Sequence, residues 1–161
     1  MGVNRSKRSI TLDLKTPAGI DVFRRLLSWA DVLVENFRPQ SLAKLGFGYP
    51  DVSRLNPKLV YCSITGYGQT GPRRHLAGMD PMIQAETGVM DLTGFPDGLP
   101  TRIPFAITDY LAGLYAHAGV LLALRERDRT GVGQHVDIAL YDSMLSVLSV
   151  QTGFLQATGA A

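Results

Sequence analysis

Two spacings of apolar residues alternate along the first 65 residues, and together they predict an α/β fold. Alternating or continuous short apolar runs are typical of strands, whereas apolar positions three to four residues apart are typical of helices. The predicted strands cover residues 8–14, 31–36 and 59–65, and the predicted helices cover 17–29, 39–45 and 50–55. This order favours a parallel sheet joined by right-handed helical crossovers.

The helix over residues 17–29 has the clearest start signal in the chain. Thr16 is suited to cap it, and Pro17 suits the first helical position because proline has no backbone N–H to leave unpaired. Its spacing predicts four buried side chains: Ile20, Phe23, Leu26 and Leu27.

The pattern changes after Gly66. Residues 66–104 are rich in Gly and Pro, with helical spacing only over 80–90, and long irregular segments of this kind are commonly functional or flexible. The rest predicts a long helix over 105–127, a turn at 130–133, a strand over 134–138 and a final helix over 139–156.

That last helix is apolar around much of its circumference, and no later segment in the sequence is available to cover it. An apolar surface of that size is typical of an interface. We therefore expect residues 1–161 to form a single incomplete domain whose final helix meets another subunit or further chain.

Bulk properties narrow the function classes. Hydrophobic residues make up 45% and charged residues 19%, as in an ordinary globular protein, and a net charge of +2 is too small to indicate nucleic-acid binding. A single cysteine, Cys62, excludes an internal disulfide. The basic N-terminus does not resemble a signal peptide, and the apolar run 111–124 is expected to be too short to cross a membrane. These features predict a cytoplasmic protein.

One carboxylate, Asp109, lies at the head of that apolar run, where it falls in the first turn of the predicted helix. Unpaired backbone N–H groups and the helix dipole favour a negative charge there, so the dipole is expected to keep the carboxylate ionised. Position alone favours a simple helix-start acid. The spacing places Leu111, Leu114, Tyr115, Ala118 and Leu122 together on one broad apolar face.

The sequence Gly66-Tyr-Gly-Gln-Thr-Gly71 matches the glycine pattern of dinucleotide-binding loops. A dinucleotide loop must open a helix, however, and residues 72–78 have no helical pattern. A glycine-rich substrate loop is the better interpretation.

A second candidate segment, Asn36-Phe-Arg38, follows a predicted buried strand, which is where open α/β sheets bind ligands. Arg38 and Lys44 are suited to phosphate groups, and Phe37 to stacking on a flat base. The alternative is an ordinary surface loop.

Metal binding is not predicted. His75 and His117 have no second imidazole or thiol at ligand spacing. His117 is expected to be a hydrogen-bonded core residue on its apolar helix, and Cys62, inside a strand, a core residue rather than a nucleophile.

Taken together, several ordered blocks resemble the family III CoA-transferases, of the formyl-CoA and carnitine CoA-transferase type, over the central portion of that family's chain. The blocks are residues 4–15, 30–39, 45–49, 56–68, 93–98 and 129–137, together with Ala106-Ile-Thr-Asp109. The resemblance implies a partial Rossmann-like nucleotide-binding domain with parallel strands and flanking helices, followed by a long helix and an apolar interface helix.

The resemblance also implies the chemistry. Asp109 corresponds to the family's nucleophile, which attacks an acyl-CoA thioester and then carries CoA as an aspartyl thioester to an acceptor carboxylic acid. Gly66, Tyr67 and Gly68 correspond to the glycine-rich part of the site, where backbone N–H groups can stabilise an oxyanion. No permanently bound cofactor is implied, because CoA and acyl-CoA are substrates. The implied CoA contacts are Leu12, Asp13, Leu14, Lys15, Asn36, Phe37, Arg38, Lys44, Ala77, Gly78, Met79 and Asp80.

A related branch, the α-methylacyl-CoA racemases, has a histidine where this chain has Met79. Methionine cannot transfer a proton, so a racemase is the weaker alternative. Family members carry a further strand–helix unit before this region and a long region after it, and they form interlocked homodimers. A non-catalytic remnant that binds CoA or a partner subunit is therefore a second alternative, and activity of the isolated chain is not expected.

Overall fold

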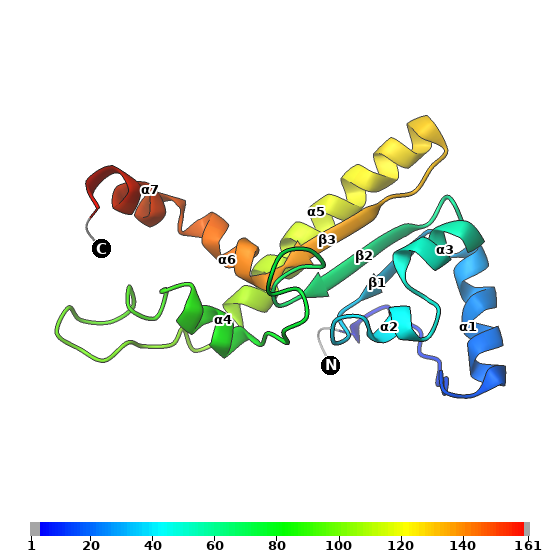
Figure 1. The fold of residues 1–161 in the computed structure, drawn as a ribbon, viewed down its shortest axis with the longest axis horizontal. Coiled ribbons are helices and arrows are strands. Elements are labelled where there is room, and N and C mark those ends of the chain that lie inside the picture. Colours follow the sequence, from blue (N-terminus) through cyan, green and yellow to red (C-terminus); the bar gives the residue numbers. More distant parts are fainter. Residues whose placement is uncertain (1–3, 160–161) are drawn as a thin grey trace.

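A three-stranded parallel sheet forms the centre of the fold in the computed structural model, which describes residues 4–159 (Figure 1). The strands are β1 (Val32–Glu35), β2 (Val60–Thr65) and β3 (His135–Ala139), in the spatial order β1-β2-β3. β2 is almost wholly buried because it has a neighbour on each side. The α/β prediction is confirmed, and three of the four predicted strands form.

Helices pack on both faces of the sheet. Their bounds are α1 (Pro17–Trp29), α2 (Ser41–Lys44), α3 (Tyr49–Leu55), α4 (Asp80–Glu86), α5 (Ile107–Thr130), α6 (Leu140–Val147) and α7 (Ser149–Thr158). Successive side chains of a strand point to opposite faces, so Tyr61 belongs to the core beneath α1–α3 and Ile64 to the core beneath α4–α6.

The start of α1 is formed as predicted. The Thr16 hydroxyl accepts a hydrogen bond from the Gly19 N–H (3.2 Å), and Pro17 opens the helix. Leu27 is fully buried, whereas Ile20 and Phe23 are half-buried against the same core.

The segment over residues 8–14 does not form a strand, so that prediction was wrong. Its side chains are mostly exposed, with Ile10 at 62%. Alternation alone does not make a strand, because the backbone also needs a neighbouring strand for its hydrogen bonds. β1 pairs only with β2 within the described residues.

Of the apolar face predicted for the long helix, only Leu111 packs against the core, and the other four residues are exposed. α5 buries Thr108 and the small residues Ala112, Ala116 and Ala123, whereas Leu114 and Leu122 are 66% and 68% exposed. Small side chains let the helix lie close to the sheet. At Gly119, which has no side chain, the helix is so close to the sheet that a Cβ would lie 2.8 Å from the Val136 side chain.

α5 is also long and apolar enough to cross a membrane by length and composition, which corrects the sequence expectation. A core helix of a folded domain passes the same test, and α5 packs against β2 and β3. Length and composition of this one helix therefore do not establish a membrane span.

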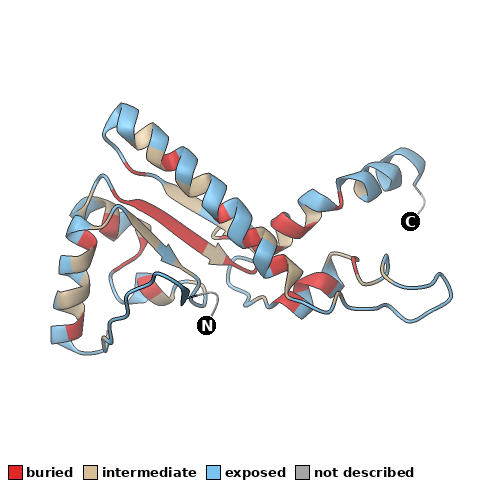
Figure 2. Ribbon diagram, turned by 180° about the vertical axis from the view of Figure 1, so that it is seen from behind, coloured by how far each residue is buried: buried red, intermediate tan, exposed pale blue. Residues whose placement is uncertain are grey.

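The predicted final helix is divided into α6 and α7 at Leu148. α6 buries Leu140 and Met144, but α7 has no buried residue. Figure 2 shows α7 and the loop after α4 projecting from the body with exposed surfaces. Phe154 is 61% exposed, as expected for a helix whose apolar side lacks cover in this chain.

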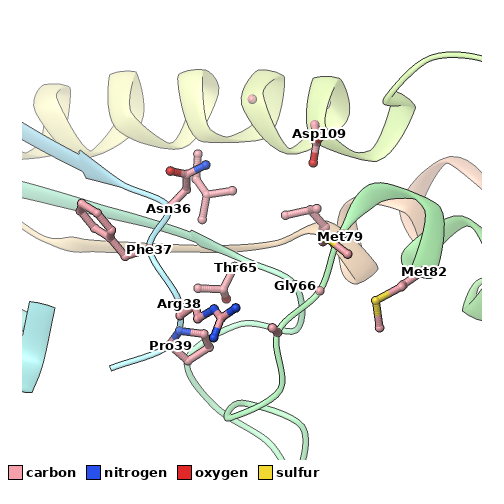
Figure 3. Close-up of a pocket in the computed structure, with 14 residues that line it drawn as sticks. Asn36, Phe37, Arg38, Pro39, Thr65, Gly66, Met79, Met82 and Asp109 are labelled. Atoms are coloured by element: carbon pink, nitrogen blue, oxygen red, sulfur yellow. The ribbon is translucent and has the colours of Figure 1, made fainter. Parts of the chain in front are cut away.

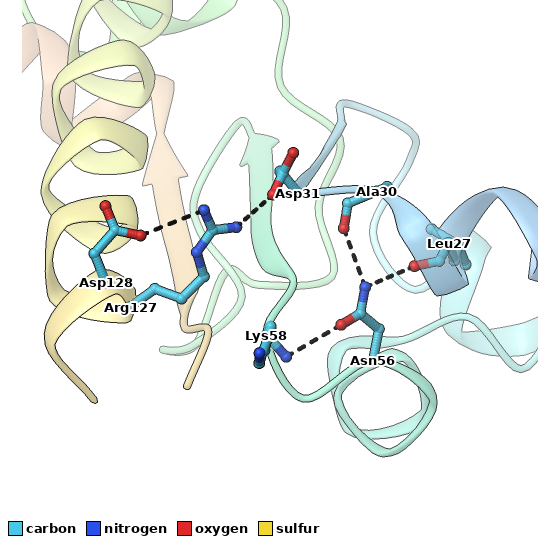
Figure 4. Close-up of polar contacts among 7 residues, drawn as sticks. All are labelled: Leu27, Ala30, Asp31, Asn56, Lys58, Arg127 and Asp128. Atoms are coloured by element: carbon cyan, nitrogen blue, oxygen red, sulfur yellow. Dashed lines mark hydrogen bonds and ion pairs between the residues drawn. The ribbon is translucent and has the colours of Figure 1, made fainter. Parts of the chain in front are cut away.

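Polar contacts join the elements at the end of the sheet where the strands begin (Figure 4). Arg127, near the end of α5, pairs with Asp31 at 2.8 Å, just before β1. The Asn56 side chain donates hydrogen bonds to the carbonyls of Leu27 (2.9 Å) and Ala30 (3.0 Å) at the end of α1. These contacts hold α1, α5 and β1 together where the strands begin, and the candidate site lies at the opposite edge of the sheet, where the strands end.

Candidate active site

A cavity of about 490 Å³ lies where the strands end (Figure 3). All three strand ends contribute to it: residues 36–39 after β1, residues 64–66 at the end of β2, and Leu140 after β3. The other walls come from residues 77–79, Met82 of α4, and Asp109 and Gly113 of α5. The carboxyl ends of parallel strands are the usual ligand site of open α/β sheets.

Asp109 points from the first turn of α5 toward these strand ends (Figure 3). Among residues 4–159 its carboxylate has no hydrogen bond or ion pair. Partial burial raises the pKa of Asp109 above its ordinary value, and the nearby charge of Asp80 raises it further. This direction is opposite to the one expected from the helix dipole alone. A carboxylate with no partner and a raised pKa is a stronger nucleophile than one neutralised by an ion pair.

The helix that carries Asp109 is held in place by a buried carboxylate, Asp80, which is only 5% exposed. One Asp80 oxygen accepts hydrogen bonds from the Thr108 N–H and hydroxyl, both at 2.9 Å. Its other oxygen accepts one from the Gln84 amide at 2.8 Å. Ala106, at the start of α5, has no side-chain cap, so Asp80 supplies this function from another helix.

Gln84 extends the same network to the segment that leads into α5. It is fully buried, and its amide oxygen accepts a hydrogen bond from the Ile103 N–H at 2.9 Å. Its amide nitrogen also lies 3.3 Å from the Phe105 carbonyl oxygen. The position of Asp109 therefore depends on side chains of α4.

Two glycines bring the loop after β2 against the segment before α4. A Cβ on Gly66 would lie 2.5 Å from the Gly78 Cα, and one on Gly78 would lie 2.6 Å from the Gly66 Cα. Any side chain at either position would force the two backbones apart. Both residues line the cavity, so their contact fixes one of its walls.

The remaining residues of the predicted glycine-rich site lie just outside the cavity lining. Tyr67 donates a hydrogen bond to Glu86 (3.0 Å), and Arg73, which pairs with the same carboxylate at 2.6 Å, lies over the Tyr67 ring. Gly68 has φ +80°, a conformation that favours glycine. No helix opens after Gly71, since α4 begins only at Asp80, as expected for a loop that is not a dinucleotide fingerprint.

The structure brings half of the predicted CoA contacts together at the cavity: Asn36, Phe37, Arg38, Ala77, Gly78 and Met79. Leu12 to Lys15 precede α1, and Lys44 is exposed at the end of α2, so none of them lines it. Asp80 is adjacent, but its oxygens are already engaged with Thr108 and Gln84. Its assignment to CoA remains a prediction, while its contacts give it a positioning role.

Several lining residues were not predicted: Pro39, Ile64, Thr65, Met82, Gly113 and Leu140. Gly113 follows Asp109 by four residues, so helical spacing could have placed both on one face. Thr65 directly precedes the glycine-rich loop at a strand end. Met82 and Leu140 gave no signal, because they join the cavity only through the packing of α4 and α6.

His117 is exposed in the structure, whereas Cys62 is buried. His117 is exposed on α5, which corrects the prediction of a core residue, because its side of the helix faces away from the sheet. Cys62 is fully buried in β2, as predicted, and burial raises the pKa of its thiol to about 11. A thiol in that state is a poor nucleophile.

Comparisons with known proteins identify the family of this chain. A sequence model described as CoA-transferase family III matches residues 1–161. The chain belongs to CoA-transferase family III. It is 49% identical over 148 residues to the succinate–glutarate CoA-transferase of Agrobacterium fabrum, covering 92% of this chain and 37% of that protein. It is 42% identical over 160 residues to the acetyl-CoA:oxalate CoA-transferase of Acetobacter aceti, covering 99% of this chain and 41% of that protein.

A solved structure supports the fold of this family III chain. The crystal structure of a CAIB/BAIF family protein from Brucella suis superposes with a TM-score of 0.93 at 48% sequence identity. The match covers 96% of this chain and 41% of that one. The chain thus spans about two fifths of the length of the relatives it matches.

Proposed function

We propose that this family III chain carries the nucleophile of a CoA-transferase that moves CoA from an acyl-CoA to a carboxylic acid. The observation that carries the proposal is Asp109, a carboxylate without a partner that faces a cavity formed by three strand ends. The relatives' names include succinyl-CoA, glutarate and oxalate, so the substrate class is a short dicarboxylic acid and its CoA thioester.

The first half of the reaction loads CoA onto the enzyme. An Asp109 carboxylate oxygen attacks the thioester carbonyl carbon, the C–S bond breaks, and CoA leaves as a thiolate with the electron pair. The product on the enzyme is a mixed anhydride. The thiolate then attacks the aspartyl carbonyl carbon of that anhydride and expels the donor acid as its carboxylate, which leaves an aspartyl-CoA thioester.

The second half repeats these steps in reverse order with the acceptor. The acceptor carboxylate attacks the aspartyl thioester and expels CoA thiolate, and the thiolate then attacks the acceptor's acyl carbon in the new anhydride. The new acyl-CoA leaves and the Asp109 carboxylate is regenerated. No proton is gained or lost in these steps, so they do not require a general base.

The walls of the cavity suit the two ends of an acyl-CoA. Arg38 is exposed at the end of β1, and it borders both the Asp109 cavity and an adjoining cavity of about 240 Å³ that contains His135. A guanidinium there can bind a phosphate of CoA in a bidentate manner. Met79 and Met82 give the Asp109 cavity flexible apolar walls against which an acyl chain can pack.

A racemase is a poorer fit for the same cavity. Racemisation needs a second acid/base group opposite Asp109, and the residue at the relevant cavity wall is Met79. A racemase would exchange the acyl α-proton for deuterium in heavy water without any acceptor acid. We expect no such exchange.

Trapping the acyl-enzyme tests the transferase proposal. The full-length protein, rather than the isolated 161-residue segment, is mixed with succinyl-CoA and hydroxylamine. The hydroxylamine nitrogen displaces CoA from an aspartyl thioester and leaves a hydroxamate. Peptide mass spectrometry is expected to place that hydroxamate on Asp109. A hydroxamate on another acid, or CoA exchange with no modification of Asp109, would contradict the proposed nucleophile.

The raised pKa of Asp109 leads to a pH prediction. Attack requires the ionised carboxylate, and raising the pKa means that protonation removes it at a higher pH than for an ordinary aspartate. The value of kcat/KM for the acyl-CoA should therefore fall on the acid side at a pH above the usual aspartate range. Substituting Asp80 with Asn removes the charge that contributes to the shift, so the acid limb should move to lower pH. An unmoved limb would mean that Asp109 does not control it.

We also propose that the active form is a cytoplasmic homodimer in the longer proteins of this family. The exposed apolar residues of α7, including Val150 (76%) and Phe154 (61%), support a covering partner. If the full chain binds CoA but shows no exchange with any dicarboxylic acid, the non-catalytic alternative is favoured instead.

A further inference from the structure

One hydroxyl at the wall of the Asp109 cavity has no hydrogen-bond partner. Thr65 is the last residue of β2 and lines the cavity, and the residue is only 5% exposed. Within residues 4–159 its Oγ1 is the single buried side-chain oxygen or nitrogen left unpaired. Native proteins seldom leave a buried hydroxyl without a partner, because its lost contact with water is then not replaced.

The other buried hydroxyls of the fold show the normal situation. Ser63 is paired with His135 (3.0 Å), Thr108 donates to Asp80 (2.9 Å), and Ser143 donates to the Ala139 carbonyl (2.7 Å). Ser63 is on the same strand as Thr65, two residues earlier, so unpaired hydroxyls are not a general property of β2. Thr65 differs from them in its place at the cavity.

The backbone around Thr65 is fixed, whereas no hydrogen bond within the described residues fixes its hydroxyl. Thr65 is in register with Ala139 of β3, and the carbonyl of the next residue, Gly66, accepts a hydrogen bond from the Tyr141 N–H at 3.0 Å. A threonine carries its hydroxyl and a methyl group on the same Cβ. A rotation of roughly 120° about χ1 therefore moves the hydroxyl into the position of the methyl group, and the methyl group into the position of the Cβ hydrogen, without moving the strand.

We propose that the Thr65 hydroxyl donates a hydrogen bond to a carbonyl-type oxygen of the bound substrate, and this inference rests on the proposed transferase function. An acyl-CoA and a carboxylic acid both bring such an oxygen, and both need a donor at a site whose one carboxylate can only accept. Asp109 attacks the carbon to which that oxygen is bonded. The oxygen gains negative charge as the new bond forms, so a hydroxyl donor stabilises the transition state more than the ground state.

The test compares Thr65→Val with Thr65→Ser in the full chain, with succinyl-CoA as donor and glutarate as acceptor. Valine keeps the shape and removes the hydroxyl, and serine keeps the hydroxyl and removes the methyl group. Because the two half-reactions share a covalent enzyme, steady-state kinetics give a separate kcat/KM for the donor and for the acceptor. Thermal unfolding without ligand is measured on all three proteins.

Thr65→Val is expected to lower kcat/KM about 10-fold, the usual effect of losing one hydrogen bond, while Thr65→Ser stays near wild type. The melting temperature of Thr65→Val should be equal to or above that of wild type, since valine removes an unpaired buried hydroxyl. A fall confined to the donor assigns the hydrogen bond to the thioester carbonyl, and one confined to the acceptor assigns it to the free acid.

Three results would overturn the inference: unchanged kinetics in Thr65→Val, an equal loss in Thr65→Ser, or a lower melting temperature in Thr65→Val, which would indicate an internal partner for the hydroxyl. If wild type itself exchanges no CoA, the proposed function fails, and that outcome is separate from a Thr65 variant that matches an active wild type.

Discussion

Replacing Asp109 with asparagine should abolish CoA transfer, with kcat falling by at least about 1,000-fold, because an amide cannot form the anhydride or the thioester. The substitution should not lower the stability of the folded protein. The pKa of Asp109 is raised in the folded state, so its ionised form at neutral pH opposes folding slightly, and the uncharged variant should melt at the same temperature or higher. Exchange of labelled CoA measures the first effect, and thermal unfolding measures the second.

Asp142 offers a matched control for that experiment. It is an exposed acid in the first turn of α6, as Asp109 is in the first turn of α5, but it does not line the Asp109 cavity. Asp142→Asn should retain wild-type exchange. If Asp109→Asn keeps more than a few per cent of the activity, the carboxylate is a helix-start acid and the nucleophile lies elsewhere.

Replacing Asp80 with alanine should cause a large loss of stability. The substitution leaves the Thr108 N–H, the Thr108 hydroxyl and the Gln84 amide without their acceptor in a buried region. Each unpaired buried group costs free energy, and the sum is expected to be about 3 kcal/mol or more of unfolding free energy. Exchange should also fall, because the start of α5 and the Asp109 carboxylate lose their fixed position. Urea denaturation, monitored by circular dichroism, measures the loss of unfolding free energy.

Two further variants show whether the lost hydrogen bonds of Asp80 cause the loss of stability. Asp91 is an exposed acid after α4, and Asp91→Ala should change the unfolding free energy by less than about 0.5 kcal/mol. Asp80→Asn retains one oxygen for Thr108 and should lie between alanine and wild type. If Asp80→Ala were as stable as Asp91→Ala, the network around Gln84 would not be what holds α5.

Local signals predicted much of this fold. The Thr16–Pro17 start and the apolar spacing placed α1 at its observed bounds, and β2 was predicted within one residue. The errors came from tertiary packing. Residues 8–14 have strand-like alternation but no neighbouring strand, and α5 buries Ala112, Ala116 and Ala123 while Leu114 and Leu122 stay exposed. A helix pattern shows which side chains share a face, but not which face finds a close partner.

The lining of the candidate site was predictable at the strand ends and not where it depends on three-dimensional contact. Arg38 follows a strand that the sequence predicted to be buried, although β1 is a half-exposed edge strand, and Asp109 lies in the first turn of a helix within a block that resembles the family's, so both were accessible from the sequence. The unpaired hydroxyl of Thr65 and the engagement of Asp80 with Thr108 became visible only in the structure. No spacing rule indicates that a residue 28 positions away caps a helix.

The contact between Gly66 and Gly78 has a consequence for redesigning the substrate range. These two backbones touch, so neither position accepts a larger residue, and that wall of the cavity keeps one shape. Room for a longer or branched acid must come from movable side chains, of which Met79 and Met82 are the nearest. Gly113 offers the opposite change, because no atom lies within 4 Å of a Cβ placed there and it borders the same cavity. An engineered enzyme for larger acids would begin by shortening a methionine, and one restricted to smaller acids would begin by adding a methyl group to α5.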